Sequence, residues 1–284
     1  MTTTIISALQ PDELVREETP VPVIPTLRRP FGTPLFLASV RSTEEAQMAL
    51  SCGADLIDCK DPSRGALGAL PVATIAAITC AVGDAANEKC AAAAGHAIAR
   101  DFETRRVPVS ATIGDCVSEA AAVRDAMAPI ARTGVDIVKV GFQPSDDVVG
   151  AIAAAGSASC LMAHQRVVAV FFADLGFEAD WIDRCAKAGF SAVMVDTAAK
   201  SAGGLRSHLS EASASRFIQR AHSAGLAAGL AGGLGIGDAQ SLVNSGADIL
   251  GFRGGLCAQA NRRLSLDADA IKALRRVLNG DVDC

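Results

Sequence analysis

Short apolar runs rich in Val, Ile and Ala alternate with segments of helical character along most of the chain. The runs are LFLASV (35–40), ADLIDC (54–59), VPVSAT (107–112), VDIVKV (135–140), RVVAVFF (166–172), SAVMVD (191–196), LAAGLA (226–231) and ADILGF (247–252). Regular strand–helix alternation is typical of parallel β/α units, in which each helix packs against the sheet. Eight such units predict an α/β fold, a closed TIM (β/α)8 barrel, which about 250 residues routinely form as one domain.

Signals at the ends of the helical segments agree with this division. The stretch from Ser42 to Glu45 has the composition of a capping box, which marks the start of a helix. Glycines stand where a helix should stop before the next strand, at Gly53, Gly134, Gly189, Gly225 and Gly246. An open doubly wound sheet is the alternative, but the first strand is followed by RSTEEA, which lacks the glycines of a nucleotide fingerprint. The barrel is therefore favoured.

The first 33 residues differ from the rest, because they hold five of the eleven prolines and show no helical or strand period. We predict an irregular N-terminal arm over residues 1–33 and a single barrel domain over residues 34–284. The second, fourth, sixth and eighth strands share one phrase, in the forms CGADLIDCK, TGVDIVKVG, AGFSAVMVD and SGADILGFRG. This indicates an internally repeated half- or quarter-barrel. The alanine-rich segment 86–100 is predicted to be an extra helical excursion.

Charge and composition narrow the class of partner. The net charge of −5 and the lack of basic runs longer than a pair argue against nucleic acid and favour a small-molecule partner. No apolar stretch reaches the roughly 18 residues of a membrane span, and the N-terminus lacks a secretory signal, so we expect a cytoplasmic protein without membrane contact. The cysteine and histidine spacings favour reduced, buried thiols over zinc or disulfides. The alanine-rich outer helices leave a homo-oligomer open.

Polar residues gather at the carboxyl ends of the predicted strands, where the active sites of such barrels lie. They are Asp58, Lys60, Lys139, Asp174, Asp196, Lys200 and Arg253. Because side chains alternate along a strand, Asp58 and Lys60 point the same way, and burying Asp58 under the helices would be costly. The same parity directs Lys139, Asp196 and Arg253 into the mouth. With Lys200, three of the six lysines are expected to converge there.

Clustered ammonium groups favour nucleophilic chemistry. In a low-dielectric mouth, mutual repulsion and desolvation lower the pKa of at least one lysine, and an unprotonated lysine attacks a carbonyl carbon. This indicates Schiff-base chemistry, in which Asp58 and Asp196 hold a second lysine charged or move protons. The alternative is a set of buried structural ion pairs, which also perturb pKa values. A cluster drawn from three strands favours the functional interpretation, and this chemistry requires no metal or other cofactor.

Glycine-rich loops follow the last two predicted strands. AGGLGIGD (231–238) and FRGG (252–255) stand where this fold commonly binds phosphate through backbone N–H groups. We predict a phosphate site there, although tight turns would use the same glycines. Its residues would be Gly232, Gly233, Gly254 and Gly255, with Arg253 adding a charged fork.

Polar residues after the third and fifth strands are further candidates. SATIGD (110–115) offers Ser110 and Thr112 for substrate hydroxyls or a second phosphate, unless these hydroxyls bond the local backbone. Asp174 follows the fifth strand and is added to the substrate-binding set. His164 precedes that strand, at the opposite end of the barrel, and is left out of the site.

Taken together, these motifs resemble one family, the (5-formylfuran-3-yl)methyl phosphate synthases, also called 4-(hydroxymethyl)-2-furancarboxaldehyde phosphate synthases. The resemblance runs from about residue 35 to residue 278. They are GADLIDCKDPSRGALGA (53–69), SATIGD (110–115), DIVKVG (136–141), FADL (172–175), VMVDTAAKSAG (193–203), LAGGL (230–234) and DILGFRGGLC (248–257). No single motif is specific, but the joined set is.

The resemblance implies a TIM-barrel carbon–oxygen lyase that condenses two molecules of glyceraldehyde 3-phosphate into a phosphorylated furan aldehyde, releasing one phosphate and water. The product would feed methanofuran or methylofuran, the furan cofactors of one-carbon metabolism. The resemblance implies that Lys60 forms the Schiff base, with Asp58 as its partner, and that Lys139 acts as proton acceptor. Asp196 and Lys200 take further active-site positions. SAGGLRSHLS (201–210) departs from the family pattern near Lys200.

In the expected mechanism, Lys60 attacks a triose phosphate carbonyl and the iminium acidifies the adjacent C–H. The resulting enamine adds to the second triose aldehyde, and loss of phosphate and water aromatises the ring. Two other functions stay open. One is another Schiff-base aldolase or a sugar-phosphate isomerase that uses the same mouth, and the other is a non-catalytic barrel that binds a phosphorylated metabolite.

Overall fold

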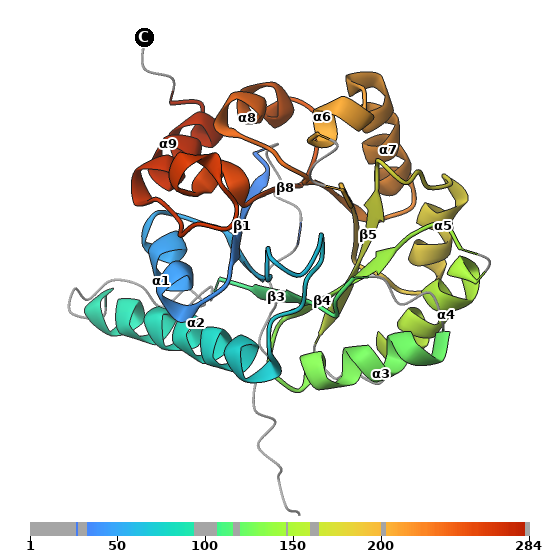
Figure 1. Cartoon of the computed structure of the whole chain (residues 1–284), viewed down its shortest axis with the longest axis horizontal. Helices are drawn as coiled ribbons and strands as arrows, with labels where there is room; N and C mark the ends of the chain where they lie inside the picture. The colour runs from blue at the N-terminus through green and yellow to red at the C-terminus, as the bar shows by residue number, and fades with distance from the viewer. Residues whose placement is uncertain are drawn as a thin grey trace, which may run out of the picture.

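The computed structural model describes residue 27 and residues 33–93, 107–115, 120–145, 147–159, 165–199 and 203–281, with the backbone alone for 84–93. Eight parallel strands pair in chain order, and the last pairs with the first to close a barrel (Figure 1). The strands are β1 (Leu35–Val40), β2 (Leu56–Cys59), β3 (Val109–Thr112), β4 (Ile137–Phe142), β5 (Arg166–Phe172), β6 (Ala192–Asp196), β7 (Ala227–Leu230) and β8 (Ile249–Phe252). Each overlaps one predicted run, so the predicted TIM barrel is confirmed.

Helices form a ring outside the strands (Figure 1). They are α1 (Thr43–Ser51), α2 (Val72–Ala93), α3 (Ala120–Ala131), α4 (Val148–Ser159), α5 (Asp180–Lys187), α6 (Leu205–His208), α7 (Glu211–Ser223), α8 (Ile236–Val243) and α9 (Ala268–Asn279), with the 3₁₀ turns η2 (Gly254–Leu256) and η3 (Ala258–Ala260). The first half of the predicted alanine-rich excursion is a continuation of α2. Residues 94–100 of that segment lie outside the described residues.

The predicted helix signals have clear structural counterparts. The Ser42 hydroxyl accepts a hydrogen bond from the backbone N–H of Glu45, as the capping box requires. The Glu45 carboxylate does not return to Ser42, because it accepts from the backbone N–H of Arg41 (2.9 Å) and pairs with Arg253. The five glycines predicted to stop helices all have φ between 80° and 93°, a backbone region that favours glycine.

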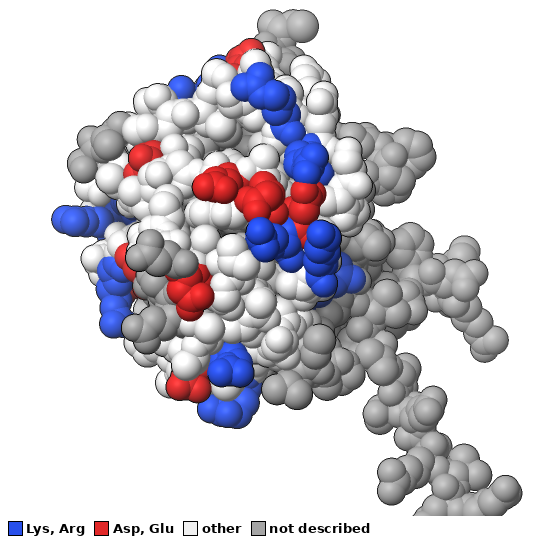
Figure 2. Space-filling model, turned by 90° about the vertical axis from the view of Figure 1, so that its right-hand side faces the viewer, with Lys and Arg blue, Asp and Glu red and all other residues white. Residues whose placement is uncertain are grey.

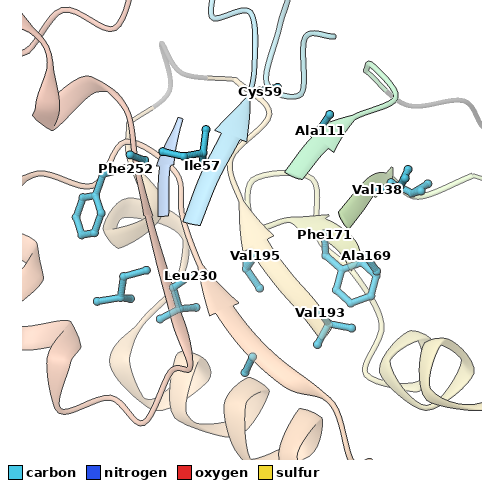
Figure 3. Close-up of a cluster of buried hydrophobic side chains, with 14 of the residues drawn as sticks. Ile57, Cys59, Ala111, Val138, Ala169, Phe171, Val193, Val195, Leu230 and Phe252 are labelled. Atoms are coloured by element: carbon cyan, nitrogen blue, oxygen red, sulfur yellow. The ribbon is translucent and has the colours of Figure 1, made fainter. Parts of the chain in front are cut away.

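Strand side chains alternate between two apolar cores, one outside the barrel and one inside it. Figure 3 shows part of the outer core, between strands and helices: Ile57, Cys59, Ala111, Val138, Ala169, Phe171, Val193, Val195, Leu230 and Phe252. The inner core includes Leu35, Leu37, Leu56, Ile137, Val168, Val170, Phe172, Ala192, Met194, Ala227 and Ile249. Leu27 of the predicted arm also belongs to the inner core. The inward positions that remain, toward the carboxyl ends, carry polar residues or glycine.

The repeated phrase has a structural role at the amino ends of the strands. In three of its copies, an aspartate accepts a hydrogen bond from a backbone N–H near the start of the preceding strand. The pairs are Phe36 to Asp55 (2.9 Å), Val109 to Asp136 (2.8 Å) and Ala228 to Asp248 (2.8 Å). Each of these carboxylates therefore ties an odd-numbered strand to the even-numbered strand that follows it. Three residues further along, the same phrase reaches the mouth at Asp58 and Lys139.

The structure describes the side chains of five cysteines, and each of these is a free thiol. Cys52, Cys59, Cys185 and Cys257 are buried, and Cys80 is exposed. Burial raises the pKa of the Cys185 thiol to about 12, so its thiolate is scarce near neutral pH.

The outer surface carries charges of both signs. On the face covered by α5 and α7, acidic and basic side chains lie next to one another (Figure 2), as in the ion pairs Arg184–Asp180 and Arg220–Asp183. Within the described residues, no helix combines the length and the apolar character that a membrane crossing requires.

The carboxylates at the amino ends should contribute to stability and not to the chemistry of the mouth. Asp136→Ala leaves the backbone N–H of Val109 without its acceptor, so we expect the free energy of unfolding to fall by about 1–3 kcal/mol. Asp136→Asn keeps an acceptor oxygen and should lose less. Urea unfolding measures both variants. Equal losses in the two variants would contradict the assigned role of the hydrogen bond.

Candidate functional site

The carboxyl ends of the strands surround a cavity of about 330 Å³, a volume at the low end for small-molecule sites. Leu37 and Met194 of the inner core contribute apolar surface to it. Its charged wall is made by Asp58, Lys60, Lys139 and Asp196, which are 1%, 8%, 4% and 4% exposed. The predicted convergence of strands two, four and six is therefore confirmed for these four residues.

Asp58 and Lys139 form the first buried ion pair in this wall. The Lys139 Nζ lies 2.9 Å from Asp58 Oδ1. The Asp58 carboxylate also accepts hydrogen bonds from the hydroxyls of Ser110 (2.8 Å) and Ser39 (3.0 Å). These two serines stand beside Asp58 in the strand register, one on each neighbouring strand. Three donors thus hold the carboxylate in one orientation, and the Ser110 hydroxyl, which we predicted as a substrate ligand, is one of them.

Lys60 and Asp196 form the second buried ion pair. The Lys60 Nζ lies 3.0 Å from Asp196 Oδ2, and the other carboxylate oxygen accepts the backbone N–H of Thr197 (2.7 Å). Lys60 keeps its inward direction because its backbone N–H bonds the carbonyl of Val40 (2.9 Å), which continues the β1–β2 ladder past the end of β2. Lys60 is therefore held at the cavity wall both through its backbone and through its amine.

The pairing corrects one expectation, because Asp58 is not the partner of Lys60. Residues two apart on one strand point the same way but lie about 6.6 Å apart along it, beyond hydrogen-bond distance. Lys60 instead meets a carboxylate on β6, and Asp58 meets a lysine on β4. The mutual repulsion expected for clustered lysines is offset, since each ammonium has its own carboxylate. Both pairs nevertheless border open volume, where a substrate can reach them.

Arg253 does not offer the free charged fork that we predicted. Its guanidinium is bidentate to Glu45 and also donates to the carbonyls of Ser39, Arg262 and Leu264. These contacts occupy all five of its N–H donors. Glu45 is buried on α1, far away in sequence, so local sequence gave no sign of this pairing. Arg253 lines the cavity but binds the protein itself.

Two other predicted substrate ligands also bond the protein. The Thr112 hydroxyl donates to the carbonyl of Leu67 and accepts the backbone N–H of Gly114, so it anchors the loop after β2. Asp174 accepts the backbone N–H groups of Ala198 (2.8 Å) and Ala199 (2.7 Å), which ties the end of β5 to the loop after β6. Both belong to the frame that positions the mouth.

The glycine loops after β7 and β8 border the cavity as predicted. Among the described residues, the backbone N–H groups of Gly233, Gly254 and Gly255 donate to no protein acceptor. A Cβ on Gly255 would lie 2.8 Å from the Cα of Gly235, so only glycine lets the two loops approach this closely. Gly232 lies beside Asp196, because a Cβ there would be 3.1 Å from Asp196 Oδ1. The loops therefore place free backbone donors next to the Lys60–Asp196 pair.

Arg262 lines the cavity and was not predicted from the sequence. Its Nη2 donates to the carbonyl of Gly65 (3.0 Å), while its Nε is buried without a partner. Burial lowers the pKa of Arg262 from its ordinary value, and the nearby Asp196 carboxylate opposes this shift. The segment ANRRLS has no strand or helix period, and only its position shortly after the glycine loop was a signal. Lys200, by contrast, lies outside the described residues, so its position stays a prediction.

Removing one member of a buried pair should be costly. Asp58→Leu leaves the Lys139 ammonium and two serine hydroxyls without their acceptor, so we expect the free energy of unfolding to fall by about 3–5 kcal/mol. Combining it with Lys139→Met removes the unpaired charge and should recover most of this loss. Urea unfolding of the two single variants and the double variant measures the coupling. A double variant no more stable than Asp58→Leu would contradict the pairing.

Solved structures similar to this chain share its fold at low sequence identity. A thiamine phosphate pyrophosphorylase from Pyrococcus furiosus is 11% identical, with a TM-score of 0.54 over 89% of this chain and 98% of that chain. A phosphoribosyl anthranilate isomerase from Thermus thermophilus is 14% identical, with a TM-score of 0.54 over 87% and 99%. At these identities the likeness concerns the barrel alone.

Sequence comparisons are more specific. A relative from Methylorubrum extorquens, provisionally named a (5-formylfuran-3-yl)methyl phosphate synthase, is 41% identical over 85% of this chain and 92% of its own length. The synthase of that name from Methanopyrus kandleri is 31% identical over 81% and 92%, and that from Methanocaldococcus jannaschii is 28% identical over 86% and 99%. Residues 36–275 match the family model described as 4-HFC-P synthase. The chain therefore belongs to the 4-HFC-P synthase family of enzymes.

Proposed function

We propose that this enzyme condenses two molecules of glyceraldehyde 3-phosphate into (5-formylfuran-3-yl)methyl phosphate through a Schiff base on Lys60. Atom balance requires the release of one phosphate and two molecules of water. The observation that carries the proposal is the Lys60 amine at the cavity wall, 3.0 Å from a carboxylate and beside loops with free backbone N–H groups. The product would serve furan cofactors of the methanofuran or methylofuran kind.

Imine formation is the first step that the geometry supports. Asp196 is placed to take a proton from Lys60 as the amine attacks the aldehyde carbon, and to return it to the hydroxyl that leaves as water. The Thr197 N–H holds the other oxygen of this carboxylate, so Asp196 stays oriented while the proton moves. The imine then acidifies the C–H on the adjacent carbon.

In this proposal, Lys139 is the base that removes that C–H proton. Lys139 is the second amine in the wall, and Asp58 lies 2.9 Å away to take up its proton and leave it basic. The serine hydroxyls on Asp58 stabilise the carboxylate before this transfer. The product of this step is an enamine whose nucleophilic carbon is carbon 2 of the first triose.

The positions of the substituents on the product decide which carbons join. In the product, the CH2 group that carries the phosphate is attached to a ring carbon that takes part in the new carbon–carbon bond. That ring carbon is therefore carbon 2 of the Lys60-bound triose, which acts as the nucleophile. Elimination of phosphate from the second triose leaves an unsaturated aldehyde whose carbon 3 is electrophilic, and these two carbons join. Closure of the ring by the oxygen on carbon 2 of the second triose then displaces Lys60, and loss of water aromatises the furan.

Trapping and turnover test the nucleophile. Borohydride added with glyceraldehyde 3-phosphate should reduce an imine on Lys60, which peptide mass mapping locates, and Lys60→Ala should form no adduct at this site. Lys187→Ala, which removes an exposed lysine on α5, is the control and should keep the adduct. Wild-type protein should release phosphate from this substrate and form a furan chromophore. Absence of any adduct would remove the imine mechanism.

Lys139 should act after the imine forms. Lys139→Ala should keep borohydride trapping on Lys60 but lower kcat for furan formation by about 10²- to 10⁴-fold, the usual effect of losing a general base. Steady-state kinetics and trapping on the same preparation measure both. Adducts with other sugar phosphates and no furan would instead favour another aldolase or isomerase, and binding without turnover would favour a non-catalytic barrel.

A further inference from the structure

We infer that Arg262 is the side chain that binds the phosphate group retained in the product, and that Arg253 is a positioning residue that holds the loop carrying Arg262. The inference rests on the proposed function for the identity of the substrate. The site itself is defined by an incompletely bonded guanidinium, free backbone donors and a cavity shared by both.

The two arginines have opposite bonding states. Arg253 donates its Nε–H to the carbonyl of Arg262 and one Nη2 hydrogen to the carbonyl of Leu264. Two of its five donors therefore fix the backbone on either side of Arg263. Arg262 uses one donor, on Gly65, and its Nε–H is buried with no acceptor. A buried unpaired donor of a charged group costs free energy, which an anionic ligand would recover.

The loop before Arg262 is held in an unusual backbone conformation. Gln259 and Ala260 have φ of 55° and 54°, a region that side chains other than glycine rarely adopt. Ala260 lines the cavity together with Arg262. Strained backbone persists where surrounding contacts impose it, and it is common at ligand-binding sites. The Arg253 hydrogen bonds fix the backbone shortly after these two residues.

Backbone donors complete the cradle beside Arg262. An ideal Cβ on Gly254 would lie 3.8 Å from the Cβ of Arg262, so these two residues are neighbours across the loop. The free N–H groups of Gly254 and Gly255 on one loop and Gly233 on the other border the same cavity. Backbone N–H groups with an arginine fork match the oxygens of a phosphate monoester.

The charge balance of the cavity also favours an anion. Each lysine of the wall has an aspartate, and Arg253 has Glu45. Asp115, another carboxylate near Arg262, accepts the backbone N–H of Leu67 (2.6 Å) and makes no ion pair with Arg262. Among the described residues that line the cavity, Arg262 is thus the cation without a matching carboxylate.

The position of the cradle selects one of the two phosphates. Gly232 of the same loop lies against Asp196, the partner of Lys60. A triose whose phosphate occupies the cradle therefore presents its aldehyde end to Lys60. That triose keeps its phosphate in the proposed reaction, whereas the second triose loses its own.

Binding of inorganic phosphate tests the site without any catalysis. Isothermal titration calorimetry with phosphate should show affinity about 10- to 100-fold weaker for Arg262→Gln than for wild type, the loss expected for a charge-assisted hydrogen bond. Arg262→Lys, which keeps the charge without the fork, should fall between them. Arg263→Gln removes the exposed neighbouring charge and should stay within about twofold of wild type. Undiminished affinity in Arg262→Gln, or no phosphate binding by wild type, would overturn the inference.

A second measurement separates phosphate recognition from a structural role. Borohydride trapping rates are compared for glyceraldehyde 3-phosphate and unphosphorylated glyceraldehyde. Arg262→Gln should slow the trapping of glyceraldehyde 3-phosphate at least tenfold more than it slows the trapping of glyceraldehyde. Equal loss with both aldehydes would show that Arg262 only stabilises the loop through Gly65. If wild type forms no adduct at all, the proposed function fails, and the calorimetric result alone decides the phosphate site.

Discussion

An ammonium group inside a barrel must find a carboxylate within hydrogen-bond distance, because the interior offers it too little water. The mouth of this enzyme satisfies that requirement twice, with Lys60 on Asp196 and Lys139 on Asp58. Each pair joins the carboxyl ends of two different strands, so the barrel itself holds the charges in place. Removing either partner would leave a buried charge unpaired. In the proposed mechanism, the same contact gives each amine a carboxylate that receives its proton.

The repeated sequence phrase places different kinds of residue at the two ends of the barrel. At the amino ends, the aspartates of the phrase accept backbone N–H groups of the preceding strands. At the carboxyl ends, the copies differ: the positions that face the mouth carry Asp58 and Lys60 in one copy, Lys139 in another and Asp196 in a third. A repeated unit can thus keep its strand-pairing residues while the residues that face the cavity diverge.

The loop residues at the mouth are of two kinds. Some form hydrogen bonds within the protein, and others keep unused hydrogen-bond donors. Thr112, Asp174 and Arg253 were all predicted to be ligands, yet each forms hydrogen bonds with the protein itself. Their bonds hold the loops that border the cavity. Arg262 and the glycine N–H groups keep unused donors beside the Lys60–Asp196 pair. In the proposed site, unused hydrogen-bonding capacity beside Lys60 distinguishes the phosphate-binding residues from the residues that hold the loops.

The sequence by itself determined the eight strands, the glycines that end the helices and the parity that turns Asp58, Lys60, Lys139 and Asp196 inward. These features depend on local periods of two and 3.6 residues, which can be read within each short segment. Only the tertiary structure decided the partners. Which lysine meets which carboxylate depends on the stagger between strands, and the saturation of Arg253 depends on Glu45, 208 residues away. The difference between Arg253 and Arg262 has the same cause. Packing of distant segments, and not the local sequence pattern, determines which N–H donors of each arginine remain free.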